Sequence, residues 1–251
     1  MNFLGIIPAR FASSRLPGKP LADIGGKPMI RWVYENTIKE LKDVIVATDH
    51  PGIEQAVLDF GGRVMMTSPD HPSGTDRCAE VTQTLANSGE EYDVIINIQG
   101  DEPFINVSHI RLLKDAFSDS DTQIATLANP IKDSAELMNP NTVKVVVNKY
   151  GNALYFSRSP IPYNRHVADD NWLTGHTYLK HLGMYAYRSE ALGQITMLRP
   201  SPLEKTESLE QLRWLDNGFM IRVLITKDPS HGIDTPGDLE AARENLKQQH
   251  D

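Results

Sequence analysis

The sequence predicts an α/β fold in which a mostly parallel sheet lies between two layers of helices, with a smaller antiparallel excursion. In the first half of the chain, short apolar runs rich in β-branched residues alternate with helix-like segments, which is typical of parallel strands joined by helices. In the second half, two such runs are joined by Asn148–Asn152, where Gly151 suits a turn, so antiparallel pairing is favoured. We therefore expect a Rossmann-like three-layer α/β/α arrangement with the strand ends along one edge.

The apolar runs and the periodic segments give the expected elements. The predicted strands are Phe3–Ile7, Val44–Ala47, Arg63–Met66, Asp93–Ile98, Val143–Val147, Ala153–Phe156, His181–Arg188 and Ile221–Ile225. The predicted helices are Met29–Ile38, about 51–60, 74–87 and 106–118, Ser208–Asp216, and a last helix from Pro236 to about Lys247, capped by Thr235. Pro8 should end the first strand, because it has no N–H for a ladder. Residues 163–178 show no periodicity, and we expect a mobile loop there.

Composition limits the classes of protein that the chain can represent. It has 251 residues, 40% of them hydrophobic, and a formal net charge of −8, as expected for a soluble globular domain without general affinity for nucleic acid or anionic membranes. No apolar run reaches transmembrane length, and no signal-like segment opens the chain, so we expect a cytoplasmic protein. The one cysteine, Cys78, excludes an intramolecular disulfide and should be a buried helix residue.

A basic loop follows the first strand. Five basic residues stand against one acid, Asp23, between positions 10 and 31: Arg10, Arg15, Lys19, Lys27 and Arg31. A loop with cations and exposed N–H groups at the carboxyl end of a first strand is a typical polyphosphate site, although such a loop can also be merely solvated. Neither GxxxxGK[ST] nor GxGxxG is present. The pattern therefore favours a nucleoside triphosphate over a dinucleotide cofactor.

Two further motifs follow predicted strands. In NIQGDEP (residues 97–103), Asp101 comes directly after a buried strand, and its carboxylate suits a Mg²⁺ that bridges phosphate oxygens. The alternative is a solvated turn, and Glu102 is expected to be structural. In SGTDR (residues 73–77), Ser73 either caps a helix or, with Gly74, brings backbone groups against a base, with Arg77 nearby.

The string PARFASSRLPGKPLADIGGKPMI resembles the signature loop of the sugar nucleotidyltransferases. More narrowly, the chain resembles the 3-deoxy-manno-octulosonate (Kdo) cytidylyltransferases. The resemblance continues through SGTDR, NIQGDEP, NPNTVKVV, ALYFSRSPIP, HLGMYAYR, PSPLEKTESLEQLR and GIDTPGDL, and so covers nearly the whole chain. It implies a fold of the nucleotide-diphospho-sugar transferase type and transfer of a cytidylyl group from CTP to Kdo, with Mg²⁺ as cofactor.

The resemblance also implies roles for individual residues. The residues implied in catalysis are Arg10, Lys19, Asp101 and Asp234, of which Asp101 and Asp234 are the implied metal ligands. Those implied in nucleotide binding are Ala9, Arg10, Arg15, Lys19, Ser73, Gly74, Arg77 and Gln99. Those implied in binding the acidic sugar are Arg158, His181, Tyr185, Glu210 and Gln211, where Arg158 suits a carboxylate because of its fork geometry.

The expected organisation is one domain, residues 1–251, that pairs as a homodimer. Its expected parts are a nucleotide-binding half at about 1–130, a sugar-binding and dimerisation region at about 131–220, and a terminal strand and helix at about 221–251. Other nucleotidyltransferases, for sialic acid, methylerythritol phosphate or a sugar 1-phosphate, remain alternatives. So do a glycosyltransferase, which would need a DxD-like motif that GDEP imitates only in part, and a nucleotide sensor without activity.

Overall fold

The computed structural model describes residues 1–12 and 16–248. The chain forms two compact units, one made of residues 1–111 with 230–251 and the other of residues 112–229. The expected functional parts of one domain, bounded near 130 and 220, stay a prediction. The last segment belongs with the first unit because the Ile233 N–H donates to the Asp101 carbonyl at 2.9 Å. Helix α4, Val107–Ala116, contains the first division.

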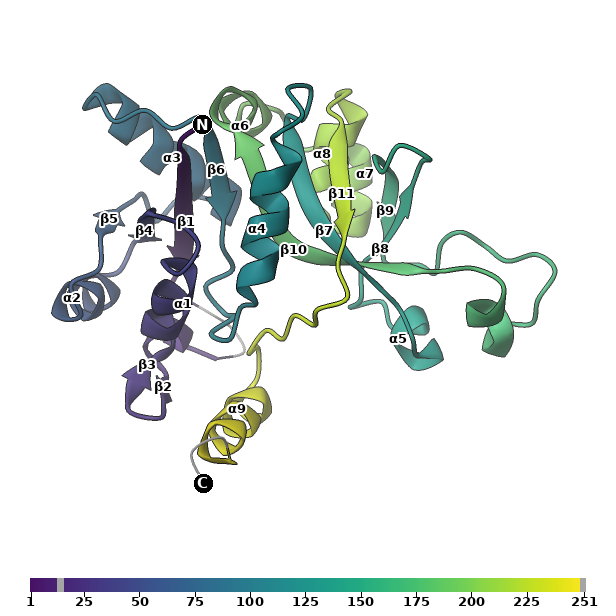
Figure 1. The fold of residues 1–251 in the computed structure, drawn as a ribbon, viewed down its shortest axis with the longest axis horizontal. Coiled ribbons are helices and arrows are strands. Elements are labelled where there is room, and N and C mark those ends of the chain that lie inside the picture. Colours follow the sequence, from purple (N-terminus) through teal and green to yellow (C-terminus); the bar gives the residue numbers. More distant parts are fainter. Residues whose placement is uncertain (13–15, 249–251) are drawn as a thin grey trace. The chain divides into compact units, whose positions relative to one another are not determined.

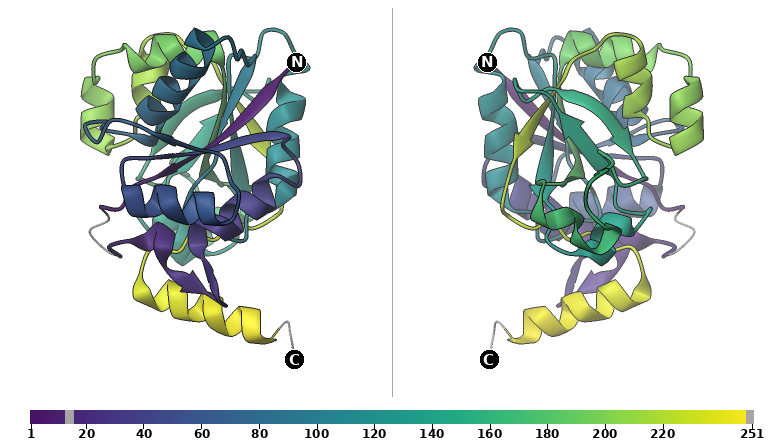
Figure 2. Two further views of the ribbon diagram at one scale, coloured as in Figure 1. Left: turned by 90° about the vertical axis from the view of Figure 1, so that its left-hand side faces the viewer. Right: turned by 90° about the vertical axis from the view of Figure 1, so that its right-hand side faces the viewer.

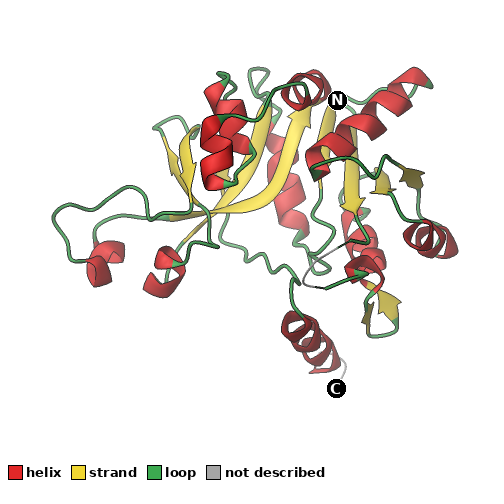
Figure 3. Ribbon diagram, turned by 180° about the vertical axis from the view of Figure 1, so that it is seen from behind, coloured by secondary structure: helices red, strands yellow, loops and turns green. Residues whose placement is uncertain are grey.

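The first unit contains a parallel sheet in the order β6-β1-β4-β5. Its strands are β1 (Phe3–Ala9), β4 (Asp43–Thr48), β5 (Val64–Met66) and β6 (Val94–Asn97), which confirms the four strands expected in the first half. Its helices are α1 (Met29–Thr37), α2 (Pro51–Asp59) and α3 (Gly74–Asn87). Because α3 leads back across the sheet, right-handed crossovers place it opposite α1, as Figures 1 and 3 show from the two sides. Cys78 is buried in α3, as expected.

Strand β1 runs past Pro8, contrary to the expectation that this proline ends it. Pro8 and Ala9 pair in parallel register with Ala47 and Thr48 of β4. On the other side, Ile6 accepts from the Ile98 N–H at 2.8 Å. Alternate residues direct their peptide groups to the same neighbour, so the missing N–H of Pro8 faces the β6 side, where the paired register has already ended. The strand therefore loses no ladder bond at Pro8.

A small hairpin and the last helix complete the first unit. The hairpin consists of β2 (Asp23–Ile24) and β3 (Lys27–Pro28), and the helix is α9 (Pro236–Gln248). A buried cluster joins Ile24 and Met29 to Ile233 and Leu239, and both views of Figure 2 show α9 alongside the hairpin. The expected terminal helix is thus confirmed, and Thr235 caps it, because its Oγ1 accepts from the Asp238 N–H at 3.2 Å.

The second unit carries the antiparallel excursion. Its strands are β7 (Ile124–Pro130), β8 (Lys144–Val147), β9 (Ala153–Ser157), β10 (Leu179–Arg188) and β11 (Ile221–Ile225). Strand β10 pairs antiparallel with β7 and β8, β8 pairs antiparallel with β9, and β11 pairs parallel with β7. This confirms a mostly parallel sheet with an antiparallel part. We did not predict β7, in which Thr126 and Asn129 interrupt the apolar residues of IATLANP although both side chains are buried.

The helices of the second unit are α5 (Ser134–Met138), α6 (Ser189–Thr196), α7 (Pro202–Glu207) and α8 (Gln211–Asp216). The helix expected over 208–216 is therefore too long. Ser208 instead ends α7 in a left-handed conformation with φ 53°, which cannot continue a right-handed helix. A capping box at Ser201 and Glu204 begins α7.

The segment 163–178, expected to be a loop, holds a short 3₁₀ helix over Asp169–Thr174. Trp172 and Tyr178 are buried in a cluster with Ile131 and Leu137. The indole N–H of Trp172 donates to the Val167 carbonyl at 3.0 Å. Outside this 3₁₀ helix the segment is a loop, as expected, and two buried aromatic side chains anchor it. Its expected mobility stays a prediction.

Candidate active site

Three charged side chains of the first unit meet at the centre of the candidate site. The Lys19 ammonium donates to Asp101 Oδ2 at 2.8 Å and to Asp234 Oδ1 at 2.9 Å. The two carboxylate oxygens are therefore no more than about 5.7 Å apart, although their residues are about 130 positions apart in the sequence. The two aspartates that were expected to act together do lie together, and Lys19 joins them.

Each member of this trio is placed by its local structure. Lys19 begins a 3₁₀ helix, Lys19–Leu21, directly after Gly18, whose φ of 68° is left-handed. Asp101 follows β6, and its carbonyl accepts the Ile233 N–H that precedes Asp234. The Asp234 N–H in turn donates to the Asp238 carboxylate at 3.0 Å. The cap of α9 thus fixes Asp234 against the end of β6.

The electrostatics of the trio favour the charged form of Lys19. Burial by itself would lower the pKa of Lys19, but the charges and hydrogen bonds of Asp101 and Asp234 outweigh it, so the pKa is raised. Lys19 therefore stays an ammonium at neutral pH. Neighbouring Glu102 is 9% exposed. Burial raises its pKa, the Asp101 charge raises it further, and a hydrogen bond with Ser230 opposes both. Its burial agrees with the structural role expected for Glu102.

Gly100 allows the loop that carries Asp101 to approach the end of β1 closely, whereas Gly74 lies beside the same strand end without needing to be a glycine. A Cβ at Gly100 would lie 2.7 Å from the Pro8 carbonyl oxygen, a contact that no alanine can make without displacing backbone. A Cβ at Gly74 would lie 3.4 Å from Pro8 Cγ and 3.8 Å from Asn97 Nδ2, which are ordinary contacts. The loop that carries Asp101 and the start of α3 therefore both rest on Pro8.

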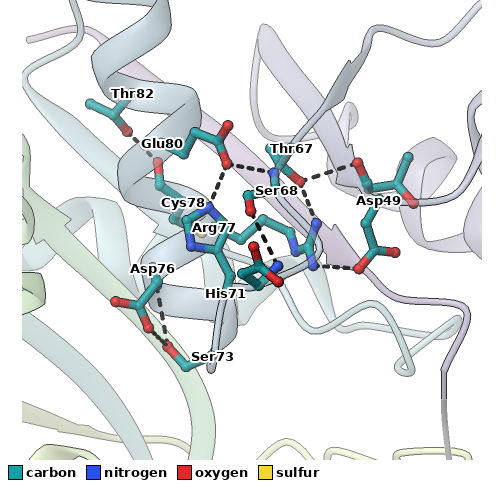
Figure 4. A network of polar contacts seen from close by, with 12 residues as sticks. Asp49, Thr67, Ser68, His71, Ser73, Asp76, Arg77, Cys78, Glu80 and Thr82 are labelled. Atoms are coloured by element: carbon teal, nitrogen blue, oxygen red, sulfur yellow. Dashed lines mark hydrogen bonds and ion pairs between the residues drawn. The ribbon is translucent and has the colours of Figure 1, made fainter.

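Polar contacts hold the start of α3, as Figure 4 shows. Ser73 caps the helix, because its Oγ accepts from the Asp76 N–H at 3.2 Å and donates to the Asp76 carboxylate at 2.6 Å. The side chain of Arg77 is fully buried; it donates to Asp49 at 2.8 Å and to the Thr67 hydroxyl. We expected Arg77 to face a nucleotide, but the structure turns its guanidinium inward, where it ties α3 to the residues after β4 and β5.

Glu80 anchors the loop that precedes Ser73, a contact that sequence reasoning missed. Its carboxylate accepts from the Ser68 N–H at 2.9 Å and contacts His71 Nε2 (Figure 4). Burial raises the pKa of Glu80, but the bonds to Ser68 and His71 outweigh it, so the pKa is lowered. The only sequence signal was the position of Glu80 one turn after Arg77 on the same helix.

The remaining nucleotide candidates lie at strand ends of the first unit. Ala9 is buried at the last position of β1, Arg10 is exposed directly after it, and Gln99 is half-buried after β6. Arg15 lies outside the described residues. Ala9, Arg10 and Gln99 therefore end neighbouring parallel strands, as the sequence predicts for this edge.

The five expected sugar-binding residues all belong to the second unit. His181 and Tyr185 lie on one side of β10 with ring centroids 5.2 Å apart, and His181 Nε2 is 3.0 Å from the Thr126 hydroxyl. Burial lowers the pKa of His181 to about 3, so the ring is neutral at pH 7. Burial raises the pKa of Tyr185 well above its usual value, and the Glu210 charge adds to this. Both rings are thus uncharged hydrogen-bonding groups.

Arg158 is held in a different way from that expected of a carboxylate ligand. Its Nε donates to the Glu207 carbonyl at 2.7 Å, and its terminal nitrogens donate to the carbonyls of Pro140 and Ser208 at 3.1 and 3.4 Å. The Glu207 carboxylate accepts from the Arg158 N–H and from the Ser157 hydroxyl. Sequence reasoning missed Glu207, although it lies inside PSPLEKTESLEQLR. Arg158 therefore ties β9 to the end of α7.

Glu210 and Gln211 stand at the start of α8. Glu210 accepts from Arg213 Nη2 at 2.8 Å, and Gln211 is 5% exposed. The described residues include no cluster of three or more His, Cys, Asp or Glu side chains suited to a metal ion. Two carboxylates are nevertheless what a Mg²⁺ takes from a protein when phosphates and water complete its shell. Asp101 and Asp234 fit that ion.

Comparison with known proteins decides the family. The family model described as cytidylyltransferase matches residues 4–225. The chain belongs to the cytidylyltransferases. It is 56% identical over 246 residues to the 3-deoxy-manno-octulosonate cytidylyltransferase of Parabacteroides distasonis, covering 96% of this chain and 97% of that one. It is also 56% identical over 250 residues to the protein of the same name from Bacteroides thetaiotaomicron, covering 98% and 99%. These findings confirm the resemblance drawn from the motifs.

Solved structures agree with the fold of this cytidylyltransferase. A CMP:2-keto-3-deoxy-manno-octonic acid synthetase complexed with CTP superposes with a TM-score of 0.91 at 46% identity, over 99% of this chain and all of the other. A glucose-1-phosphate thymidylyltransferase from Bacillus anthracis superposes with a TM-score of 0.64 at 17% identity, over 98% and 95%. The second similarity shows the fold alone, which is the nucleotidyltransferase type expected. No helix in the described part of the chain has the length and apolar character needed to span a membrane.

Proposed function

We propose that this protein transfers the cytidylyl group of CTP to Kdo, giving CMP-Kdo and pyrophosphate for lipopolysaccharide biosynthesis. The observation that carries the proposal is the convergence of Lys19, Asp101 and Asp234 at the edge where β1 and β6 end. The names of the relatives, at 56% identity over nearly the full chain, support Kdo as the acceptor. The reaction joins the anomeric oxygen of Kdo to the α-phosphorus and breaks the bond from that phosphorus to the bridging oxygen of pyrophosphate. The hydroxyl proton is released.

In this proposal Asp101 and Asp234 hold Mg²⁺, which supplies positive charge beside the phosphates. Lys19 and Arg10 contact the triphosphate and stabilise the charge that grows on the departing pyrophosphate. Ala9, Gln99, Ser73 and Gly74 present backbone and side-chain groups to the nucleotide. Arg77 acts indirectly, because it holds α3, which begins at Gly74, against the residues after β4 and β5. Positioning and charge neutralisation carry the catalysis, because in-line displacement at phosphorus needs no covalent enzyme intermediate.

The acidic sugar is assigned to the second unit. His181 and Tyr185 are both uncharged at neutral pH, which suits hydrogen bonds to the sugar hydroxyls. Glu210 and Gln211, at the start of α8, are assigned to the same hydroxyls. Arg158 is the cation assigned to the sugar carboxylate. A guanidinium has five N–H donors, and three of them donate here to backbone carbonyls, so Arg158 can receive the carboxylate while these bonds hold it in place.

The test is pyrophosphate release from CTP, with Kdo, sialic acid or a sugar 1-phosphate as acceptor, with and without Mg²⁺. We expect release with Kdo and Mg²⁺, and loss of release in Asp101→Asn. The control is Asp59→Asn, a change at an exposed carboxylate on α2, which should behave as the wild type. Release with another acceptor in place of Kdo would assign a different nucleotidyltransferase. CTP binding without release under any condition would indicate a sensor.

The proposal also includes a cytoplasmic homodimer. Exposed apolar side chains of the second unit support pairing through that unit: Leu154 on β9 is 58% exposed, and Met220 and Ile225 at β11 are 53% and 48% exposed. Sedimentation velocity at low micromolar concentration should give twice the monomer mass. Leu154→Asp should shift the protein to monomer, and monomer alone in the wild type would refute pairing.

A further inference from the structure

The Lys19 ammonium lies between the same two carboxylates that we assign to the metal. It is 2.8 Å from Asp101 Oδ2 and 2.9 Å from Asp234 Oδ1, and the Lys19 side chain is only 14% exposed. The two carboxylates are 30% and 42% exposed. The ammonium is thus the more shielded partner, and water screens it less than an ordinary surface lysine.

A divalent cation needs the oxygens that this ammonium contacts. Mg²⁺ binds carboxylate oxygens at about 2.0–2.1 Å, so an ion shared by Asp101 and Asp234 must enter the space that separates their oxygens. Lys19 Nζ is already within hydrogen-bond distance of both. The ion and the ammonium would also repel each other as like charges at short range. The pair of carboxylates can therefore bind the metal ion or the Lys19 ammonium, but not the two together.

Only the side chain of Lys19 has to move for the exchange. Its N–H donates to the Leu16 carbonyl at 3.1 Å, and its carbonyl accepts from the Ala22 N–H at 3.0 Å. These bonds fix the backbone of the 3₁₀ turn. The four-carbon stem of lysine is flexible and ends in a compact charge, so the ammonium can turn from the carboxylates to another anion nearby.

We propose that Lys19 competes with the divalent cation for Asp101 and Asp234, and keeps the metal site closed until a nucleotide arrives. The triphosphate draws the ammonium away, and the two carboxylates then receive the metal. The inference rests on the proposed function, because it takes the aspartates as metal ligands and Lys19 as a phosphate ligand. It makes metal binding conditional on nucleotide, so the free protein has low affinity for the ion.

The experiment measures Mn²⁺ binding to the nucleotide-free protein by the electron paramagnetic resonance signal of the free ion. Lys19→Met removes the competing charge and keeps an unbranched, flexible side chain only one atom shorter. We expect it to bind Mn²⁺ roughly tenfold tighter or more, the effect of losing a partly shielded ion pair. Adding Asp101→Asn to Lys19→Met should remove the gain, which places the ion on these carboxylates. Lys19→Gln serves as a second variant if Lys19→Met does not fold.

The matched control is Lys27→Met. Lys27 belongs to the same unit, pairs with Glu35 at 2.8 Å and is 34% exposed, so this variant loses the same net charge away from the two aspartates. Its Mn²⁺ affinity should equal that of the wild type. An equal gain in Mn²⁺ affinity in Lys19→Met and Lys27→Met would mean that net charge alone causes the effect. If neither Lys19→Met nor Lys19→Gln binds Mn²⁺ more tightly than the wild type, the proposed competition is wrong.

The two proposals fail in different ways. If the wild type releases pyrophosphate from CTP and Kdo but Lys19→Met shows no gain in Mn²⁺ affinity, the activity stands and the competition is wrong. If no acceptor yields pyrophosphate while Lys19→Met binds Mn²⁺ more tightly, the competition for the carboxylates stands and the proposed reaction is wrong.

Discussion

Gly100→Ala tests how closely the loop that bears Asp101 must approach β1. The added Cβ would lie 2.7 Å from the Pro8 carbonyl oxygen and 3.6 Å from Ile7 Cγ2. The first contact is too short by more than half an ångström and involves backbone on both sides, so no side chain can turn away to relieve it. Forcing an extra carbon into a packed region costs about 1–3 kcal/mol, and we expect that loss in the free energy of unfolding.

The same displacement should lower activity, because Asp101 follows directly and its oxygen must stay near that of Asp234. Urea unfolding followed by circular dichroism measures the first effect as a lower midpoint with an unchanged slope. In a protein of this size the melting temperature should fall about 2–4 °C for each kcal/mol lost. Pyrophosphate release measures the second effect.

Gly74→Ala is the matched control for Gly100→Ala, because its Cβ would meet Pro8 too, but at 3.4 Å from a side-chain carbon. Gly74 is also the first residue of α3, where alanine favours the helix. Its free energy of unfolding should be unchanged or slightly higher. If Gly100→Ala and Gly74→Ala have the same stability as the wild type within about 0.5 kcal/mol, the close contact at Pro8 is refuted.

Asp101→Asn and Asp234→Asn should each lower the rate of pyrophosphate release at least about 10²-fold, while CTP binding remains detectable by calorimetry. The double variant should be little worse than either single variant. Additive losses in the double variant would contradict a shared ion. Arg158→Lys should raise the KM for Kdo more than that for CTP, because lysine lacks the fork; equal increases would leave Arg158 a purely structural role. The pKa of His181 falls from 6.5 to about 3 on folding, so its contribution to stability is complete above pH 6.5 and is lost as the pH falls toward 3, by up to about 1.4 kcal/mol per pH unit. His181→Gln should flatten that slope in urea unfolding between pH 7 and 5, and an unchanged slope would contradict the buried neutral ring.

The local sequence pattern was sufficient to predict an element wherever the segment determines its own structure. The apolar runs of β1, β4 and β6 and the periods of α1 and α3 were predictable, because burial on a sheet or a helix face leaves its period in the sequence. Ser73 and Thr235 were recognisable as helix caps because a cap bonds to a residue only three positions away in the sequence. Errors arose where a neighbour decided the outcome. Pro8 continues β1 because its missing N–H faces a side without a partner.

For the candidate site, too, the sequence determined some features and the tertiary structure decided the others. The motifs by themselves determined the family and the residue types at the strand ends, including the two aspartates and the basic loop. Only the tertiary structure decided that Lys19 bridges Asp101 and Asp234, and that Arg77 and Arg158 direct their guanidinium groups to Asp49 and to backbone carbonyls. The physical reason is that a charged side chain takes its partner from whatever the fold brings within about 3 Å, and residues far apart in sequence leave no periodic trace of that meeting.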